Sequence, residues 1–155
     1  MTTSQTLIWY IIAMDKPRVG LGVIVKNLQG QILVIKRIGA HAQYWSIPGG
    51  HLEMGETFEQ GAKRELKEEL DITIKKPKVI AVTNNLKTYR SEGLHYISII
   101  LLAETFSGQP KIMEPEKCSH FKWCNPNKLP QPHFDASELG VSCYLKNRPY
   151  VGITK

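Results

Sequence analysis

The chain has 155 residues, of which 42% are hydrophobic and 22% charged, and its formal net charge is +6. These values are ordinary for one globular domain that is large enough to bury a proper core. A basic surface attracts phosphate groups. The sequence has no long Lys/Arg run and no basic helix with interleaved aromatic residues, so we expect a small phosphorylated partner rather than a nucleic acid.

The first residues form a separate N-terminal extension. The apolar run at 7–14 is too short to span a bilayer and follows no positively charged residue, so we expect neither a membrane span nor a signal peptide. The run is either an extra strand or an arm that packs against a partner subunit; alternatively, Met14 is the native start. We therefore divide the chain into an extension at 1–17 and one domain at 18–155.

Cysteine usage bears on the cellular compartment. Cys118, Cys124 and Cys143 are odd in number and lack the C-x-x-C spacing of a metal site. This pattern predicts free thiols in a reducing cytosol. We therefore expect a cytoplasmic protein.

Beyond the extension, the hydrophobic pattern predicts a mixed α/β domain. Strands are expected at 19–26, 31–37, 72–84, 94–105 and 121–124. The turn at 27–30 would join the first two strands as a hairpin, and loops or polar connections are expected at 38–44, 87–93 and 106–117. Helices are expected at 57–70 and 134–146, which gives a sheet with helices on two faces.

The first of these helices has a clear start and one apolar face. Thr57 can cap its N-terminus, and Glu56 and Glu59 place negative charge near that end. No proline interrupts the segment 57–70. The residues of the apolar ridge recur every four positions, at Phe58, Ala62, Leu66 and Leu70. This ridge is the face that the helix is expected to bury.

Three carboxylates lie beside this ridge. At about 100° per residue, Glu65 and Glu69 share a neighbouring stripe and Glu68 lies next to Glu65. Their mutual repulsion would be costly without a nearby positive charge, and Arg64 can offset only one of them. Clustered hard oxygen ligands suit Mg²⁺ or Mn²⁺, which keep several waters and accept substrate phosphates as further ligands. We therefore predict a divalent metal site on this helix.

The spacing of these residues follows a known pattern. The specified positions are Gly50, Glu56, Arg64, Glu65, Leu66, Glu68, Glu69 and Ile72. This arrangement resembles the Nudix box, and its one departure is Asp71, where the family usually has glycine. Asp71 is expected at the C-terminal end of the helix in a left-handed conformation, with its charge at the unfavourable end of the helix dipole.

The resemblance to Nudix hydrolases extends over about residues 18–146. The Lys36-Arg37 pair, the segment Trp45-x-x-Pro-Gly-Gly-His-Leu-Glu and the segment Glu114-Pro-Glu-Lys are similar to the MutT-like, nucleoside triphosphate diphosphatase branch. The resemblance implies an α/β/α sandwich with a mixed sheet between helices. It also implies cleavage of a nucleoside diphosphate linked to another moiety.

The resemblance also implies roles for individual residues. The metal ligands would be one backbone carbonyl and three carboxylates, from Gly50, Glu65, Glu68 and Glu69. The expected ion is Mg²⁺, with Mn²⁺ as a substitute, and Glu68 would be a further or water-mediated ligand. Glu56 and Arg64 would brace the loop against the helix.

The general base stays open at this point. Family members use either a glutamate of the box or an acid from a later loop. Glu116 and Glu114 therefore compete with Glu65 and Glu68 for this role.

Substrate contacts are expected from several segments. Arg37 is the best phosphate clamp because its planar fork binds phosphate oxygens bidentately, and a solvated charge at the strand end is the alternative. Lys36 points to the opposite face, towards solvent. The other candidates are Ser46, Gly49, His51, His95, Phe134 and Leu139. Aromatic stacking would favour any base without choosing one, and His95 has a purely structural alternative.

Three functions are consistent with these residues. The leading one is Mg²⁺-dependent hydrolysis of a nucleoside triphosphate, standard or modified, to a monophosphate and pyrophosphate. The second is hydrolysis of ADP-ribose or a nucleotide sugar. The third is a nucleotide-sensing or RNA-binding module without turnover, although such a module would not need all three carboxylates. Related enzymes are often homodimers, and the apolar segments 7–14 and 94–102 offer surface for pairing, although core burial explains the second equally well.

Overall fold

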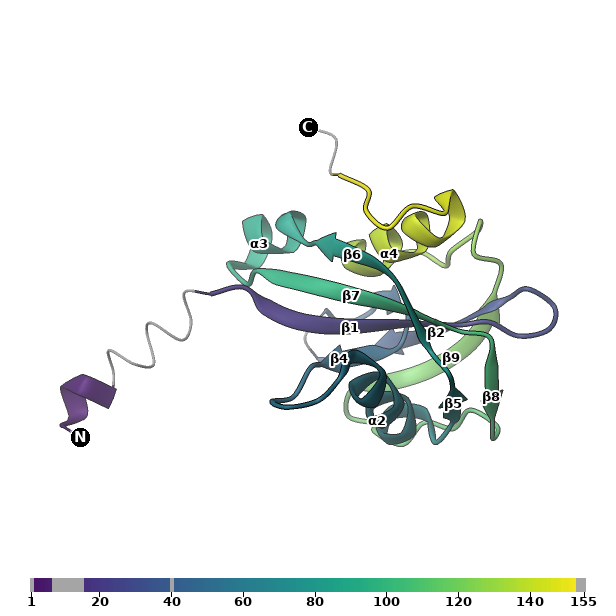
Figure 1. The fold of residues 1–155 in the computed structure, drawn as a ribbon, viewed down its shortest axis with the longest axis horizontal. Helices are drawn as coiled ribbons and strands as arrows, with labels where there is room; N and C mark the ends of the chain where they lie inside the picture. The colour runs from purple at the N-terminus through teal and green to yellow at the C-terminus, as the bar shows by residue number, and fades with distance from the viewer. Residues whose placement is uncertain (1, 7–15, 40, 153–155) are drawn as a thin grey trace.

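The computed structural model of the protein describes residues 2–6, 16–39 and 41–152 (Figure 1). Its strands are β1 (Arg18–Val25), β2 (Ile32–Arg37), β3 (Trp45–Ser46), β4 (Gly49–His51), β5 (Thr73–Lys75), β6 (Lys78–Asn84), β7 (Tyr96–Ala103), β8 (Thr105–Ser107) and β9 (Cys118–Cys124). The helices of the domain are α2 (Phe58–Leu70), α3 (Leu86–Glu92) and α4 (Asp135–Lys146). The apolar run at 7–14 lies outside the described residues, so the strand and arm hypotheses stay predictions.

Two sheets form the centre of the domain. The larger sheet has the order β4-β1-β7-β6, in which β1 runs parallel to β7 and the other two pairings are antiparallel. The second sheet has the order β3-β2-β9 and is antiparallel throughout. Strands β5 and β8 form a separate short pair. The predicted mixed sheet is therefore confirmed.

Helices cover these sheets on both sides. In Figure 1, α2 lies on one side of the larger sheet and α3 and α4 lie on the other. Val23 packs into the core with Leu66 of α2, whereas its neighbour Ile24 packs into the core with Val141 of α4. Because adjacent strand residues face opposite sides, β1 contributes to both cores. The arrangement confirms the predicted α/β/α sandwich.

The predicted hairpin around the turn 27–30 is wrong beyond a single bridge between the two strands. The turn itself is present, since Gly30 N–H donates to the Asn27 carbonyl at 3.0 Å. However, β1 and β2 share only the isolated bridge between Lys26 and Ile32, and then they enter different sheets. The chain does reverse its direction at this turn, as predicted. However, β1 and β2 form their sheets with strands from more distant segments of the chain.

Three other boundaries differ from the expected ones. The polar connection at 87–93 is the helix α3, which ends at Gly93 in the left-handed conformation with φ of 73°. The long strand expected at 72–84 is divided into β5 and β6, with Lys76 at φ of 45° between them. The strand expected at 94–105 is divided into β7 and β8. Because β7 lies between β1 and β6, it offers no free edge for pairing with another subunit.

Within the described ranges, none of the helices has the length and apolar character that crossing a bilayer requires.

Candidate active site

Helix α2 is held in place by caps at both ends. Thr57 accepts a hydrogen bond from the backbone N–H of Gln60, and the Gln60 side chain accepts one from the N–H of Thr57, which makes a complete capping box. At the other end Asp71 adopts the left-handed conformation with φ of 54°, as predicted. Its carboxylate pairs with Lys67, which lowers the pKa of Asp71 from its ordinary value. The lysine thus offsets the charge that the helix dipole disfavours.

The buried face of α2 fixes its orientation. Ala62, Leu66 and Leu70 are fully buried, as the apolar ridge predicted. Phe58 departs from that prediction, because it is 36% exposed at the first turn. Gly61 is buried instead, and a side chain there would collide with Leu21 of β1. This close approach of helix and strand brings the carboxylates beside the ridge close to β4.

The glycines of β4 are required by this close packing. Gly49 has φ of 153°, and a Cβ atom on it would lie 1.9 Å from the Leu21 carbonyl oxygen. Its N–H donates to Oε2 of Glu69 at 3.0 Å. A Cβ atom on Gly50 would lie 2.2 Å from Oε1 of Glu65. The two glycines therefore form a cradle in which the carboxylates of α2 approach the backbone directly.

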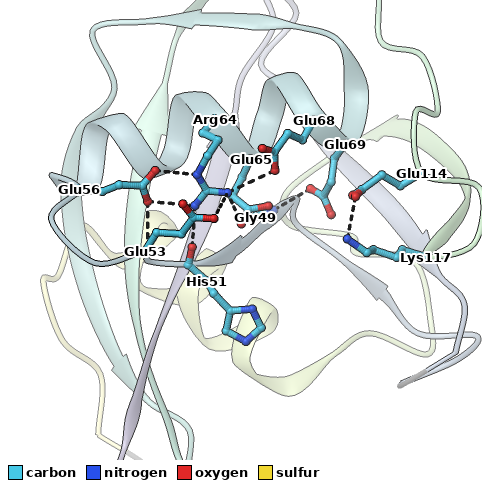
Figure 2. Close-up of polar contacts among 10 residues, drawn as sticks. All are labelled: Gly49, His51, Glu53, Glu56, Arg64, Glu65, Glu68, Glu69, Glu114 and Lys117. Atoms are coloured by element: carbon cyan, nitrogen blue, oxygen red, sulfur yellow. Dashed lines mark hydrogen bonds and ion pairs between the residues drawn. The ribbon is translucent and has the colours of Figure 1, made fainter.

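Arg64 links the box residues (Figure 2). Its Nε donates to Oε1 of Glu56 at 2.6 Å and its Nη2 donates to Oε2 at 3.0 Å, which is a bidentate pair. Nη2 also donates to the His51 carbonyl at 2.9 Å, so the guanidinium ties α2 to β4. These bonds raise the pKa of Arg64 and lower that of Glu56 to about 2. The bracing role expected for Glu56 and Arg64 agrees with this geometry.

The three carboxylates of α2 do not all share one partner in this structure. Arg64 Nη1 donates to Oε1 of Glu65 at 3.0 Å and to Oε2 of Glu68 at 3.3 Å. Glu69 instead bonds the Gly49 N–H. Throughout 2–6, 16–39 and 41–152, no three His, Cys, Asp or Glu side chains converge as a ready-made metal site. Convergence on one ion would require Glu68, which is 53% exposed, to leave Arg64.

The residues present nevertheless fit a divalent cation. The donor set consists of hard oxygens, which Mg²⁺ and Mn²⁺ prefer. The missing side chain at Gly50 leaves the Glu65 carboxylate in direct reach of the backbone at the turn. Burial raises the pKa of Glu69 to about 8, against the opposing effect of the Gly49 hydrogen bond. A buried carboxylate of this kind is stabilised in its charged form by an adjacent cation.

Arg37 lies beside an aromatic ring, and the charges of acidic side chains act on it. Burial lowers its pKa from the ordinary value, while the charges of Glu69 and Glu92 act in the opposite direction. The guanidinium carbon of Arg37 lies 5.4 Å from the centroid of the Phe134 ring. His41 also contacts Phe134, with 4.6 Å between the two ring centroids. Nδ1 of His41 is 3.0 Å from Oε1 of Glu92. The structure thus brings Arg37 and Phe134 together, as a phosphate clamp beside a stacking surface requires.

Ser46 is the second predicted substrate residue with an unusual environment. It is 2% exposed, and its hydroxyl is the one buried side-chain polar atom in the described part of the chain that lacks a hydrogen-bond partner. It pairs with Ile35 on β2, two residues before Arg37. Because alternate strand residues share a face, Ser46 and Arg37 lie on the same side of this sheet. An unpaired buried hydroxyl is costly unless a ligand completes it.

The other predicted substrate residues are less closely joined. His51 is exposed, and its Nε2 lies 2.9 Å from the Tyr96 hydroxyl. His95 bonds Oδ1 of Asn84 at 2.6 Å, which favours the structural alternative for that residue. Leu139 is half-buried on α4. None of these three is brought to Arg37 by a contact between described residues.

A series of hydrogen-bonded polar side chains near the Gly50 turn was not predicted from the sequence. Thr83 donates to Oδ1 of Asn85 at 2.8 Å, and Asn85 donates to Oγ of Ser98 at 2.8 Å. Ser98 Oγ lies 3.4 Å from the place that a Cβ atom on Gly20 would occupy, and that place is 3.7 Å from the Gly50 carbonyl oxygen. This series of hydrogen-bonded hydroxyl and amide groups therefore ends close to the Gly50 turn. The signal in the sequence was the polar run Thr83-Asn84-Asn85.

The two acids of the later loop differ in position. Glu114 is 23% exposed at its side chain, pairs with Lys117 at 2.7 Å, and its charge acts on Glu69. Met113 N–H donates to the Glu69 carbonyl at 3.0 Å, which fixes the loop against the end of α2. Figure 2 shows Glu114 and Lys117 beside Glu69. Glu116 is exposed. The geometry favours Glu114 over Glu116 as the loop acid that serves the site.

A cavity of about 500 Å³ lies elsewhere, under the C-terminal end of α4. Its lining includes Ile80, Leu102, Tyr144 and Arg148, and it contains no carboxylate. The clustered carboxylates that could hold a divalent cation lie at α2 beside β4, so the candidate site is there rather than in this cavity.

Comparison with known proteins identifies the family of the domain. The NUDIX domain model matches residues 16–142. The MutT NUDIX hydrolase of Burkholderia pseudomallei is 32% identical, with a TM-score of 0.76 over 83% of this chain and 98% of that one. The NUDIX domain of Shewanella oneidensis NrtR, solved with ADP ribose, is 18% identical with a TM-score of 0.69 over 94% of this chain and 99% of that one, which shows the fold alone.

The curated relatives match over a shorter region. The RNA pyrophosphohydrolase of Erwinia tasmaniensis is 38% identical over 76 residues, which are 49% of this chain and 42% of the relative. The chain therefore covers less than half the length of this relative. The matched family, the shared fold and the box geometry lead to one conclusion: the chain belongs to the NUDIX family, as the sequence predicted.

Proposed function

We propose that the protein is a pyrophosphohydrolase that cleaves a nucleoside triphosphate, standard or modified, to a nucleoside monophosphate and pyrophosphate. The observation that carries this proposal is the position of Arg37. Its guanidinium carbon is 5.4 Å from the centroid of the Phe134 ring, and the negative charge of Glu69 on α2 acts on it. A nucleotide has the same order of groups, with phosphates at one end and an aromatic base at the other.

The metal would be held by Glu65, Glu68 and Glu69 together with the Gly50 carbonyl, and members of this family generally use divalent cations. When bound, Mg²⁺ would neutralise charge on the phosphate oxygens and lower the pKa of a nearby water. The bonds from Arg64 to Glu65 and from the Gly49 N–H to Glu69 hold these two carboxylates in position before the substrate arrives, whereas Glu68 would move away from Arg64 to join them. This preorganisation avoids reorganising charged groups during the reaction.

Each remaining group has a role in the same step. Arg37 would bind phosphate oxygens through its planar fork and draw the nucleotide towards Phe134. The hydroxyl of Ser46 would donate a hydrogen bond to the substrate, or accept one from it, on the side of the sheet that Arg37 occupies. Glu114 would accept the proton from the attacking water, whose oxygen forms the new bond to phosphorus as the bridging oxygen leaves with pyrophosphate. Glu65 is the alternative proton acceptor within the box.

The substrate is tested by one panel. Purified protein is assayed with Mg²⁺ against standard and oxidised nucleoside triphosphates, ADP-ribose, nucleotide sugars and a 5′-triphosphorylated RNA, and the products are resolved. Release of pyrophosphate from a free triphosphate is the expected result. Turnover of ADP-ribose alone would contradict the proposal. Tight nucleotide binding without turnover would support the binding-module alternative.

Hydrolysis of 5′-triphosphorylated RNA is a second candidate. It is favoured by the RNA pyrophosphohydrolases that match 49% of this chain. A faster reaction with this RNA than with any free triphosphate would make it the preferred substrate.

We further propose a homodimer in the cytoplasm. The three cysteines are free thiols, as a reducing compartment would require. The dimer depends on the extension, since β7 has neighbours on both edges. Light scattering at micromolar concentration, with and without residues 1–13, measures the assembly. A monomer mass for the full chain would contradict the dimer.

A further inference from the structure

The sheet β3-β2-β9 and the loops around it carry an unusual charge distribution. No Asp or Glu occurs from residue 16 to 52 or from 117 to 134, and all three strands of this sheet lie within those segments. The Lys and Arg side chains on these strands are Lys36, Arg37 and Lys122, and His120 adds an imidazole ring. The two segments contain eight Lys or Arg residues, of which Lys36, Arg37 and Lys122 are on this sheet, so its strands carry positive charge with no acidic residue to offset it.

Strand register places Lys36, His120 and Lys122 on one face. Lys36 is directly opposite Trp45 on one side and His120 on the other. Lys122 is opposite Val34, which is two residues before Lys36 and so shares its face. Opposed residues in an antiparallel pair project to the same side of the sheet. Arg37, the next residue along, projects to the other face, where the charge of Glu69 acts on it.

An indole ring lies in the middle of these cations. The Lys122 ammonium is 4.4 Å from the centroid of the Trp45 ring, and the Lys36 ammonium is 5.8 Å from it. Trp45 and Lys36 are half-buried, whereas His120 and Lys122 are exposed. We call this surface of Trp45, Lys36, His120 and Lys122 the Trp45 patch. Among the described residues, no ion pair links Lys36 or Lys122 to a carboxylate.

We propose that the Trp45 patch binds single-stranded nucleic acid. An aromatic face beside unpaired cations is the combination that single strands use, since bases stack on the ring while phosphates meet the ammonium groups. The long stem of Lys122 allows its head to leave the indole for a phosphate, and a base then takes its place over the ring. An acidic peptide would use the cations but would leave the aromatic face without a partner.

The patch is separate from the hydrolytic site. It lies on the face of β2 opposite to Arg37, and its residues have no part in the chemistry proposed above. Binding there goes beyond hydrolysis of a free nucleotide, because it gives the protein a contact with a polynucleotide. The sequence analysis missed it, since its four residues come from three strands and form no run.

The test measures binding without hydrolysis. A single-stranded RNA of about 10 nucleotides with a 5′-hydroxyl end, which offers no phosphoanhydride to cleave, carries a 3′ fluorophore for anisotropy at about 50 and 200 mM salt. We expect salt-dependent binding by the wild type. The double variant Lys36→Gln/Lys122→Gln should bind about tenfold or more weakly, with the log–log salt slope smaller by about 1.4 because two phosphate contacts are lost.

The matched control is Lys75→Gln/Lys78→Gln, which removes the same charge from exposed positions on β5 and β6. It should bind RNA nearly as well as the wild type. Trp45→Leu should weaken binding about tenfold, and Trp45→Phe should lose less because it keeps a stacking ring. If Trp45→Leu does not fold, the lysine pair and Trp45→Phe still decide the question.

Several results would overturn the proposal. These are equal losses in the two double variants, equal affinity for single-stranded and duplex RNA, and displacement of the RNA by polyglutamate at the same charge concentration. The last result would identify an acidic polypeptide as the partner. Mononucleotide hydrolysis should be unchanged in Lys36→Gln/Lys122→Gln, so a failure of the patch and a failure of the proposed enzyme are distinguishable.

Discussion

Arg64 holds Glu56 through two hydrogen bonds, at 2.6 and 3.0 Å, and also donates to the carbonyl of His51 at 2.9 Å. One guanidinium therefore connects α2, the loop before it and β4. A lysine at this position carries the same charge but has a single ammonium group, so it cannot form the same planar fork. The role of Arg64 is thus geometric as well as electrostatic.

This geometry makes Arg64→Lys a test of the brace. We expect turnover to fall about 10- to 100-fold, which is the usual cost of losing a group that orients metal ligands. The thermal midpoint should fall as well, because Glu56 loses its bidentate partner. The measurement is turnover at saturating Mg²⁺ together with thermal unfolding. Arg90→Lys, at an exposed position on α3, is the control and should change neither property.

The same pair predicts how stability depends on pH. The hydrogen bonds from Arg64 lower the pKa of Glu56 from 4.5 to about 2. A carboxyl with a lower pKa in the folded state stabilises the protein above the unfolded value and loses this effect as the pH falls. Stability should therefore decline between pH 4.5 and about 2. Glu69, with a pKa of about 8, titrates above this window.

Thermal unfolding across that window measures the effect. Glu56→Gln should show a shallower acid decline than the wild type. Glu104→Gln removes a carboxyl whose pKa is also lowered, by Lys26, but which is 53% exposed. Its effect on the decline should be smaller, because solvent screens an exposed pair. An acid decline that is the same in wild type and Glu56→Gln would contradict the assignment.

Glu69→Gln tests the metal assignment. The change keeps the size of the side chain and the helix propensity but removes one charged oxygen, so we expect turnover to fall at least about a hundredfold. Folding should survive, because glutamine can still accept from the Gly49 N–H. Glu59→Gln, on the same helix but outside the box pattern, should cost little. Near-normal turnover in Glu69→Gln would contradict most of the proposed mechanism.

The loop acids are separated by a matched pair of variants. Glu114 lies beside Glu69, whereas Glu116 is exposed. If Glu114 takes the proton from water, Glu114→Gln should lower turnover by about 10²- to 10⁴-fold. Glu116→Gln should leave turnover close to that of the wild type. The reverse order, or equal small effects, would assign the base to Glu116 or to Glu65.

The parts of this molecule that could be predicted from sequence are the local ones. The capping box at Thr57, the buried ridge at Ala62, Leu66 and Leu70, and the left-handed Asp71 all depend on residues within one helix. Their spacing fixes their relative positions once the helix forms. The bonds that Arg64 makes to Glu65 and Glu68 follow from the same spacing.

The parts that could not be predicted depend on strand partners that are distant in sequence. The turn at Gly30 indicated a hairpin, but β2 pairs with β3 and β9 instead of β1. Helix α3 was missed because the polar segment 87–93 was interpreted as a connection. In the structure its N-cap residue Asn85 makes no capping bond and directs its side chain to Ser98. The contact between Arg37 and Phe134 joins segments almost a hundred residues apart. Only the fold brings them together.

The final prediction concerns Gly50. A Cβ atom there would lie 2.2 Å from Oε1 of Glu65 and 2.3 Å from its Cδ. Because these atoms are at the far end of a flexible side chain, the carboxylate can swing away and the protein should still fold. The Glu65 carboxylate would then be displaced from the turn, and a displacement of about 1 Å costs up to about a hundredfold in rate. We therefore expect Gly50→Ala to lower turnover about 10- to 100-fold with a nearly unchanged thermal midpoint.

Gly20→Ala, whose Cβ atom would have its nearest neighbour at 3.4 Å, is the matched control and should keep Mg²⁺-dependent turnover closer to that of the wild type. Equal turnover in Gly50→Ala and the wild type would show that Glu65 does not need its place against the turn.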